Sequence, residues 1–129
     1  MIKGSCMCQS VKYEITGDIG GAIHCHCKTC QKAHSTAFSS VAMVMDENFK
    51  VTKSQGLKSY ESSVGKSRYF CSNCGSQIYA KKINTPHIVL RLGSLDSDLK
   101  LKEQKHIWYS HKVSWFDLDS KIERCKEFE

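Results

Sequence analysis

Cys25-His26-Cys27-Lys28-Thr29-Cys30 places three thiols within six residues of backbone. Cysteines this close together can bind one metal ion, and Zn²⁺ takes four such ligands at the corners of a tetrahedron. Three cysteines leave the fourth corner for water, a substrate thiol or a ligand from elsewhere in the chain. The stretch therefore predicts an open zinc site made by Cys25, Cys27 and Cys30.

Two further cysteine pairs lie on either side of this stretch. Cys71-Ser72-Asn73-Cys74-Gly75 is typical of a zinc knuckle, in which a tight turn presents two thiols to one ion. Cys6 and Cys8 are two residues apart, so both face the same side of an extended backbone. We expect Cys6, Cys8, Cys71 and Cys74 to form a closed structural site, which brings the total to two Zn²⁺ per chain.

Other interpretations of the cysteines remain open. His24 or His34 could supply the fourth ligand and close the three-cysteine site, whereas His26 alternates with the cysteines and should point away from the ion. The pairs Cys27-x-x-Cys30 and Cys71-x-x-Cys74 could instead be redox pairs, although neither follows a thioredoxin-like βαβ pattern. Eight cysteines also allow four disulfides if the chain is exported.

The length and composition indicate one soluble globular unit. A chain of 129 residues with 40% hydrophobic and 25% charged residues is expected to form a single zinc-binding domain over residues 1–129. The beginning of the sequence has no signal-peptide pattern and no run is long and apolar enough for a membrane, so we expect a cytoplasmic protein. The formal charge is +6, but the charged residues form no run of like sign, so we do not expect nucleic acid as a partner.

The hydrophobic pattern predicts a mainly β fold. Val11, Tyr13 and Ile15 alternate with polar residues, and similar short runs follow over residues 22–27, 38–45, 77–81 and 87–92. A short helix is expected over residues 31–34. At the carboxyl end, a second short helix is predicted because Leu118, Ile122, Cys125 and Phe128 recur at helical spacing and Ser120 with Glu123 fits a capping box. Cys125 would then be an ordinary buried thiol.

The order of these motifs resembles the glutathione-dependent formaldehyde-activating enzyme and centromere protein V family. The resemblance spans most of the chain. It depends on Gly4-Ser5-Cys6-Met7-Cys8, Cys25-His26-Cys27-Lys28-Thr29-Cys30-Gln31-Lys32, Phe70-Cys71-Ser72-Asn73-Cys74-Gly75-Ser76, Gly93-Ser94-Leu95-Asp96 and His106-Ile107-Trp108.

The resemblance implies several short, coiled antiparallel sheets and the same division into a four-cysteine and a three-cysteine zinc site. It also implies an activity, the joining of glutathione and formaldehyde into S-hydroxymethylglutathione. Residues 117–129 lack the proline-containing ending of many relatives.

We therefore expect a zinc-dependent carbon–sulfur lyase that adds a formaldehyde-like aldehyde to a thiol such as glutathione, working as a monomer or homodimer. The alternative is a non-enzymatic zinc module that binds a thiol carrier, a protein or nucleic acid. Lys28 and Lys32 could meet glutathione carboxylates. No catalytic residue is assigned, and the conceivable proton donors are His26, His34, Tyr60, His106 and Tyr109.

Overall fold

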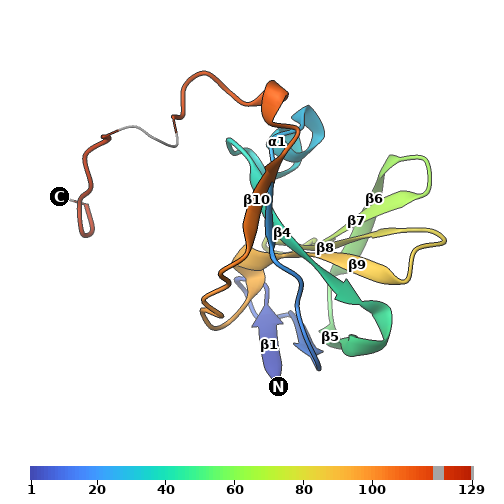
Figure 1. Ribbon diagram of the computed structural model, residues 1–129. Coiled ribbons are helices and arrows are strands. Elements are labelled where there is room, and N and C mark those ends of the chain that lie inside the picture. Colours follow the sequence, from blue (N-terminus) through green and yellow to red (C-terminus); the bar gives the residue numbers. More distant parts are fainter. Residues whose placement is uncertain (118–120, 129) are drawn as a thin grey trace.

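The structure is a computed structural model that describes residues 1–117 and 121–128. A three-stranded antiparallel sheet has the order β1-β2-β5 and consists of β1 (Ile2–Ser5), β2 (Val11–Ile15) and β5 (Phe49–Ser54). Figure 1 shows β1 and β5 at one end of the molecule and the helix α1 at the other. The three-stranded sheet thus closes the end opposite α1.

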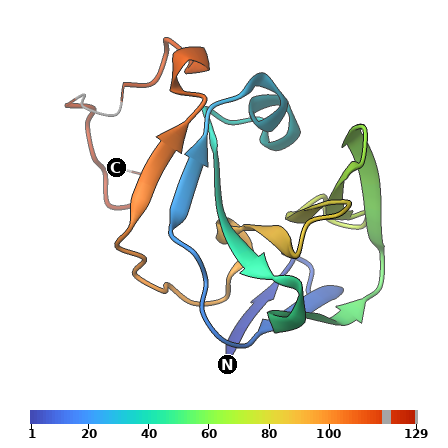
Figure 2. The ribbon, with the colours of Figure 1, turned by 45° about the vertical axis from the view of Figure 1, so that its right-hand side comes forward.

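A seven-stranded sheet forms the larger part of the fold, with the order β10-β3-β4-β9-β8-β7-β6. Its strands are β3 (Ala22–Cys25), β4 (Ser39–Met45), β6 (Leu57–Ser63), β7 (Lys66–Cys71), β8 (Gln77–Lys82), β9 (His87–Arg91) and β10 (Gln104–Ile107). All neighbours are antiparallel except β10, which runs parallel to β3. Figure 2 shows β10, β3 and β4 as one upright group, with the hairpin of β6 and β7 opposite them.

The described residues also contain one α-helix and three 3₁₀ turns. The helix α1 (Lys28–His34) joins β3 to β4, and the 3₁₀ turns are η1 (Asp46–Asn48), η2 (Leu92–Ser94) and η3 (Tyr109–His111). Ser35 caps the carboxyl end of α1 and adopts a left-handed conformation with φ of 50°. None of the helices in the described residues is both long and apolar enough to cross a membrane.

The main core contains side chains from both sheets. On β2, Val11, Tyr13 and Ile15 are almost fully buried, as their alternation with polar residues predicts. They pack with residues of the larger sheet and with two cysteines, namely Val44, Ile78, Ile88, Leu90, Cys6 and Cys71. Burial of such apolar side chains, worth about 25 cal/mol per Å², holds the two sheets together.

The ring of Tyr13 lies against Gly4 in the small sheet. The two residues lie opposite each other on β2 and β1, and a methyl group at Gly4 would lie 2.0 Å from Cζ of Tyr13. The Tyr13 hydroxyl lies 2.7 Å from the Ser94 hydroxyl, and burial raises the pKa of Tyr13 to about 12. Glycine at position 4 therefore allows the tyrosine ring to reach η2 across the strand.

The mainly β fold and its antiparallel sheets are confirmed, but the carboxyl end differs from the prediction. Residues 121–128 include no helix, and Figure 1 shows the chain beyond η3 extending away from the sheets. Cys125 is exposed rather than buried, and Phe128 makes no packing contact that reduces its exposure. Helices shorter than about 12 residues are marginal in water without tertiary packing, which explains the difference. Leu118 and Ser120 lie outside the described residues.

The contact between Gly4 and Tyr13 gives a test of the packing between β1 and β2. We expect Gly4→Ala to lower the free energy of unfolding by about 1–3 kcal/mol, because the added methyl group displaces a fully buried ring. The matched control is Gly93→Ala, since a methyl group there would meet no atom within 4 Å. Urea unfolding of both variants measures the difference, and equal midpoints would contradict this account of the packing.

Candidate metal centres

Four cysteines from distant parts of the chain meet between the two sheets. Cys6 and Cys8 belong to the loop between β1 and β2, Cys71 ends β7, and Cys74 lies in the turn before β8. The four sulfur atoms all lie within 4.8 Å of one another. Cys6 and Cys71 are buried, whereas Cys8 is exposed. The grouping joins the amino-terminal strands to the middle of the larger sheet.

The spacing of these sulfur atoms fits a tetrahedral ion. The Sγ atoms of Cys6 and Cys8 are 3.6 Å apart, and those of Cys8 and Cys71 are 3.8 Å apart. A tetrahedron with zinc–sulfur distances of about 2.3 Å has edges of about 3.8 Å. A disulfide would need about 2.05 Å, so the described cysteines are free thiols arranged as a ligand set.

Hydroxyl and amide groups surround this four-cysteine cluster. Ser10 Oγ lies 3.0 Å from Cys8 Sγ and 3.2 Å from Cys71 Sγ, and Asn73 Nδ2 donates to Cys8 Sγ at 3.2 Å. Ser10 and Asn73 lower the pKa of Cys8 to about 7, and Ser76 lowers the pKa of Cys74 to about 5. These groups favour the thiolate, which is the form that binds a metal.

The knuckle turn depends on backbone hydrogen bonds. Gly75 adopts φ of 81° and donates its N–H to the Cys71 carbonyl at 2.7 Å, while the Cys71 N–H donates to the Ser76 carbonyl at 2.9 Å. A positive φ strains residues that carry a Cβ, and glycine avoids that strain. The turn therefore holds the thiols of Cys71 and Cys74 on the same side of the backbone.

The second cluster contains Cys25, Cys27 and Cys30, whose sulfur atoms also lie within 4.8 Å of one another. Cys25 ends β3, and Cys30 lies in the first turn of α1. The predicted strand over residues 22–27 is shorter in the structure because Cys27 caps α1, and its Sγ accepts from the Cys30 N–H at 3.4 Å. The three thiols thus converge where a strand passes directly into a helix.

No described histidine or carboxylate completes this three-cysteine cluster. His24, one of the two candidates for a fourth ligand, lies 2.9 Å from the Ser40 hydroxyl and 2.8 Å from Gln104 Oε1 through its two ring nitrogens. His34, the other candidate, is outside the cluster, and burial beside Arg91 and Arg68 lowers its pKa to about 4. In the described part of the chain, the cluster therefore offers three ligands.

Cationic side chains lie beside the three cysteines. Arg68 Nη2 is 3.9 Å from Cys30 Sγ, and its Nε donates to Ser62 Oγ at 2.9 Å. Burial raises the pKa of Cys25 to about 12. Burial acts in the same direction on Cys30, but the Ser39 hydroxyl, the neighbouring thiols and Arg68 together lower the pKa of Cys30 to about 7. Arg68 therefore favours negative charge on the cluster.

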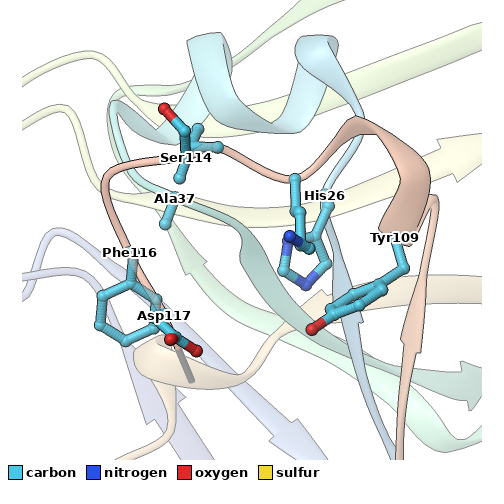
Figure 3. A pocket seen from close by; sticks show the side chains of 8 residues that line it. His26, Ala37, Tyr109, Ser114, Phe116 and Asp117 are labelled. Atoms are coloured by element: carbon cyan, nitrogen blue, oxygen red, sulfur yellow. The ribbon is translucent and has the colours of Figure 1, made fainter. Parts of the chain in front are cut away.

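His26 lies on the other side of the backbone, as its alternation with the cysteines predicts. It is buried, and its Nε2 is 2.9 Å from His106 Nδ1. His26 lines a cavity of about 210 Å³. Figure 3 shows its ring beside Tyr109, with Phe116 and Asp117 on the other side of the cavity. His26, His106 and Tyr109 thus form one aromatic cluster, separate from the thiols, whereas Tyr60 is exposed on β6.

Sequence reasoning did not identify the buried arginines Arg68 and Arg91 or the buried Gln31. Gln31 donates from Nε2 to the His26 carbonyl at 2.7 Å and to the His111 carbonyl at 3.0 Å, which ties η3 to the start of α1. Arg91 ends the apolar run Ile88-Val89-Leu90. The sequence signal for Arg91 was its position between the apolar residues Leu90 and Leu92. A charged residue at such a position is seldom buried without a partner, so it indicates a site.

The fold and its two thiol clusters define a β-sheet protein with two possible metal sites. The sequence profile of the glutathione-dependent formaldehyde-activating enzyme family matches residues 1–111, and the chain belongs to this family.

Individual proteins are also similar to this chain. A putative glutathione-dependent formaldehyde-activating enzyme of Halomonas elongata is 24% identical over 97% of this chain and 86% of its own length. An uncharacterized lyase of Schizosaccharomyces pombe is 29% identical over 60% of this chain and 55% of its own length. A crystal structure of a Rhodobacter sphaeroides protein has a similar fold, with a TM-score of 0.64 and 21% identity over 74% of this chain and 89% of that one.

The two clusters should respond differently to loss of one thiol. We expect Cys71→Ser to leave the protein unfolded, because structural zinc sites supply about 10–16 kcal/mol, comparable to the stability of a whole domain. Cys27→Ser should fold with one zinc fewer, since serine also caps helices. Zinc content and circular dichroism measure both, with the exposed Cys125→Ser as control. Equal misfolding of Cys71→Ser and Cys27→Ser would remove the distinction between the clusters.

His34 predicts a specific pH dependence of stability. Because its pKa falls from 6.5 to about 4 on folding, the unfolded chain binds more protons between these values. The stability that neutral His34 contributes to the folded state is present in full above pH 6.5 and is lost as the pH falls toward 4. In His34→Gln, the free energy of unfolding should therefore decrease less between pH 6.5 and 4 than in the wild type. Urea unfolding at several pH values measures this. His111→Gln, an exposed control, should follow the wild type, and an equal decrease in His34→Gln would contradict the prediction.

Proposed function

We propose that this chain is a zinc-dependent carbon–sulfur lyase that adds formaldehyde, or a similar aldehyde, to a thiol such as glutathione. Cys6, Cys8, Cys71 and Cys74 would hold a structural zinc, and Cys25, Cys27 and Cys30 would hold a second zinc with one exchangeable position. The observation that carries the proposal is the difference between the clusters, four thiols in one and three in the other. Membership of an enzyme family whose description names both reactants supports it.

The proposed reaction needs no oxidant or reductant. A carbon–sulfur bond forms between the thiol and the aldehyde carbon, the carbon–oxygen double bond becomes a single bond, and the thiol proton ends on the aldehyde oxygen. A zinc ion held by three thiolates lowers the pKa of a thiol at its fourth position and can polarise a carbonyl group. The reverse direction is the lyase reaction.

The chain's own residues would supply the electrostatic part of this chemistry. Arg68 contacts Cys30, and Lys66 lies close enough to Cys30 and Cys25 to interact with their charge. Burial and the two arginines lower the pKa of Lys66. Fixed cations in a partly buried site stabilise a substrate thiolate and the negative charge that develops on the aldehyde oxygen. Arg68 and Lys66 are therefore candidates for stabilising the reacting groups.

The activity is tested by following exchange between ¹³C-labelled formaldehyde and glutathione by NMR in the presence of zinc-loaded protein. We expect wild type to accelerate the exchange and Cys27→Ser to reduce it to the uncatalysed rate, because this variant would lose the second zinc and with it the exchangeable position. Cys125→Ser should retain the wild-type rate, since the exposed Cys125 belongs to neither cluster. Failure of the zinc-loaded wild type to accelerate exchange with glutathione or other small thiols would favour a non-enzymatic zinc module instead.

A further inference from the structure

Arg91 is a buried cation with unused hydrogen-bond donors. It ends β9 and is only 5% exposed. Its Nε and Nη2 atoms are buried and meet no acceptor in the described part of the chain. A buried donor without a partner costs about 1–3 kcal/mol, and more when it is charged. Such a side chain is expected to have a function that offsets this cost.

The two unused donors of Arg91 form a matched pair. In the planar guanidinium group, Nε and Nη2 lie on the same edge, so their N–H bonds point in parallel. This edge fits the two oxygens of a carboxylate, which it binds through two hydrogen bonds. Arginine is preferred over lysine where a planar anion is bound in this way.

A cavity of about 490 Å³ lies beside Arg91, at the carboxyl end of α1 and the start of β4. Polar side chains line much of it, including His34, Ser40, Gln77 and Ser94. Ser39 also lines the cavity. It pairs with Cys25 across β3 and β4, and its hydroxyl lowers the pKa of Cys30. It therefore adjoins the three-cysteine cluster.

The charges around the cavity favour an anion. Arg68, Arg91 and Lys66 are near the three-cysteine cluster. The ion pair of Lys81 with Asp46 involves none of these three cations. Burial and Arg68 lower the pKa of Arg91 to about 10, so it stays protonated at neutral pH. Three thiolates with one Zn²⁺ carry a charge of −1, which leaves the three cations in excess. An additional anionic group would balance this excess.

The thiolates interact with Arg91 through their charge but do not satisfy its free N–H groups. Arg68, not Arg91, makes the contact with a sulfur, since no hydrogen bond of Arg91 to a thiol occurs in the described residues. Lys28 and Lys32, which could meet substrate carboxylates on sequence grounds, are exposed on α1. Exposed lysines bind anions weakly, because solvent screens their charge.

We infer that Arg91 anchors a carboxylate-binding subsite in this cavity, so that the substrate carries an acid group as well as its thiol. The identification of the ligand as the thiol substrate rests on the proposed function, whereas the subsite itself does not. One molecule would place its sulfur at the three-cysteine cluster and its carboxylate at Arg91. The subsite would select acidic thiols and fix the orientation of the sulfur.

The test compares probes that differ in the acid group. Isothermal titration calorimetry with zinc-loaded wild type should show 3-mercaptopropionate binding about tenfold more tightly than 3-mercaptopropionamide, which corresponds to about 1.4 kcal/mol. Arg91→Met should bind both equally, with affinity for the amide unchanged. Arg124→Met, which removes an exposed arginine in the carboxyl-terminal segment, should keep the wild-type preference.

A second measurement is independent of the metal and of the thiol. 3-(Methylthio)propionate has no free thiol, and we expect it to shift the Arg91 Nε–Hε signal in ¹⁵N NMR spectra of the wild type. If Arg91→Met does not fold, this shift and the preference of the wild type for acid over amide still test whether Arg91 binds a carboxylate.

The outcomes separate the two proposals. Equal affinity of the wild type for acid and amide, or an acid preference retained in Arg91→Met, would overturn the subsite and leave the proposed function standing. A shifted Arg91 signal with no thiol binding at the cluster would support the subsite and contradict the proposed function. Absence of any shift at Arg91 would overturn the subsite.

Discussion

The approach of Cys6 and Cys8 to Cys71 and Cys74 is the constraint on which the rest of the structure depends. Two of these thiols come from the loop between β1 and β2, and two come from the turn between β7 and β8. The contact therefore joins the small sheet to the large one beside the shared core of Tyr13, Ile78 and Leu90. Four thiols brought this close without an ion would carry unfavourable repulsion once ionised, so metal binding and assembly of the two sheets are expected to be coupled.

The second cluster has a different relation to the fold. Cys25, Cys27 and Cys30 are local in sequence, and the passage from β3 into α1 is enough to bring them together. The fold contributes the surroundings rather than the cluster itself. Arg68 approaches from β7, and Ser39 approaches from β4. These distant residues set the charge and polarity around the thiols, and the proposed chemistry depends on them.

Several features could be predicted from the sequence because they depend on short-range geometry. The alternation of Val11, Tyr13 and Ile15 predicted a half-buried strand, and the position of His26 between two cysteines predicted that its ring would point away from them. The carboxyl-terminal helix was wrong within residues 121–128, because helical spacing alone provides no surface for packing. The spacing of Ile122, Cys125 and Phe128 carried no information about what those side chains would contact.

The sequence by itself determined which neighbouring thiols can face the same side of the backbone, since spacings of two and three residues restrict where a sulfur atom can point. It also determined that strands would dominate the fold. Only the tertiary structure brought Cys6 and Cys8 to Cys71 and Cys74. Only the tertiary structure decided that Arg68 and Arg91 are buried beside the three-cysteine cluster and that neither His24 nor His34 joins it. The reason is physical: charge environment and burial are sums over neighbours from many strands, and those neighbours are fixed by the packing of the sheets rather than by local spacing.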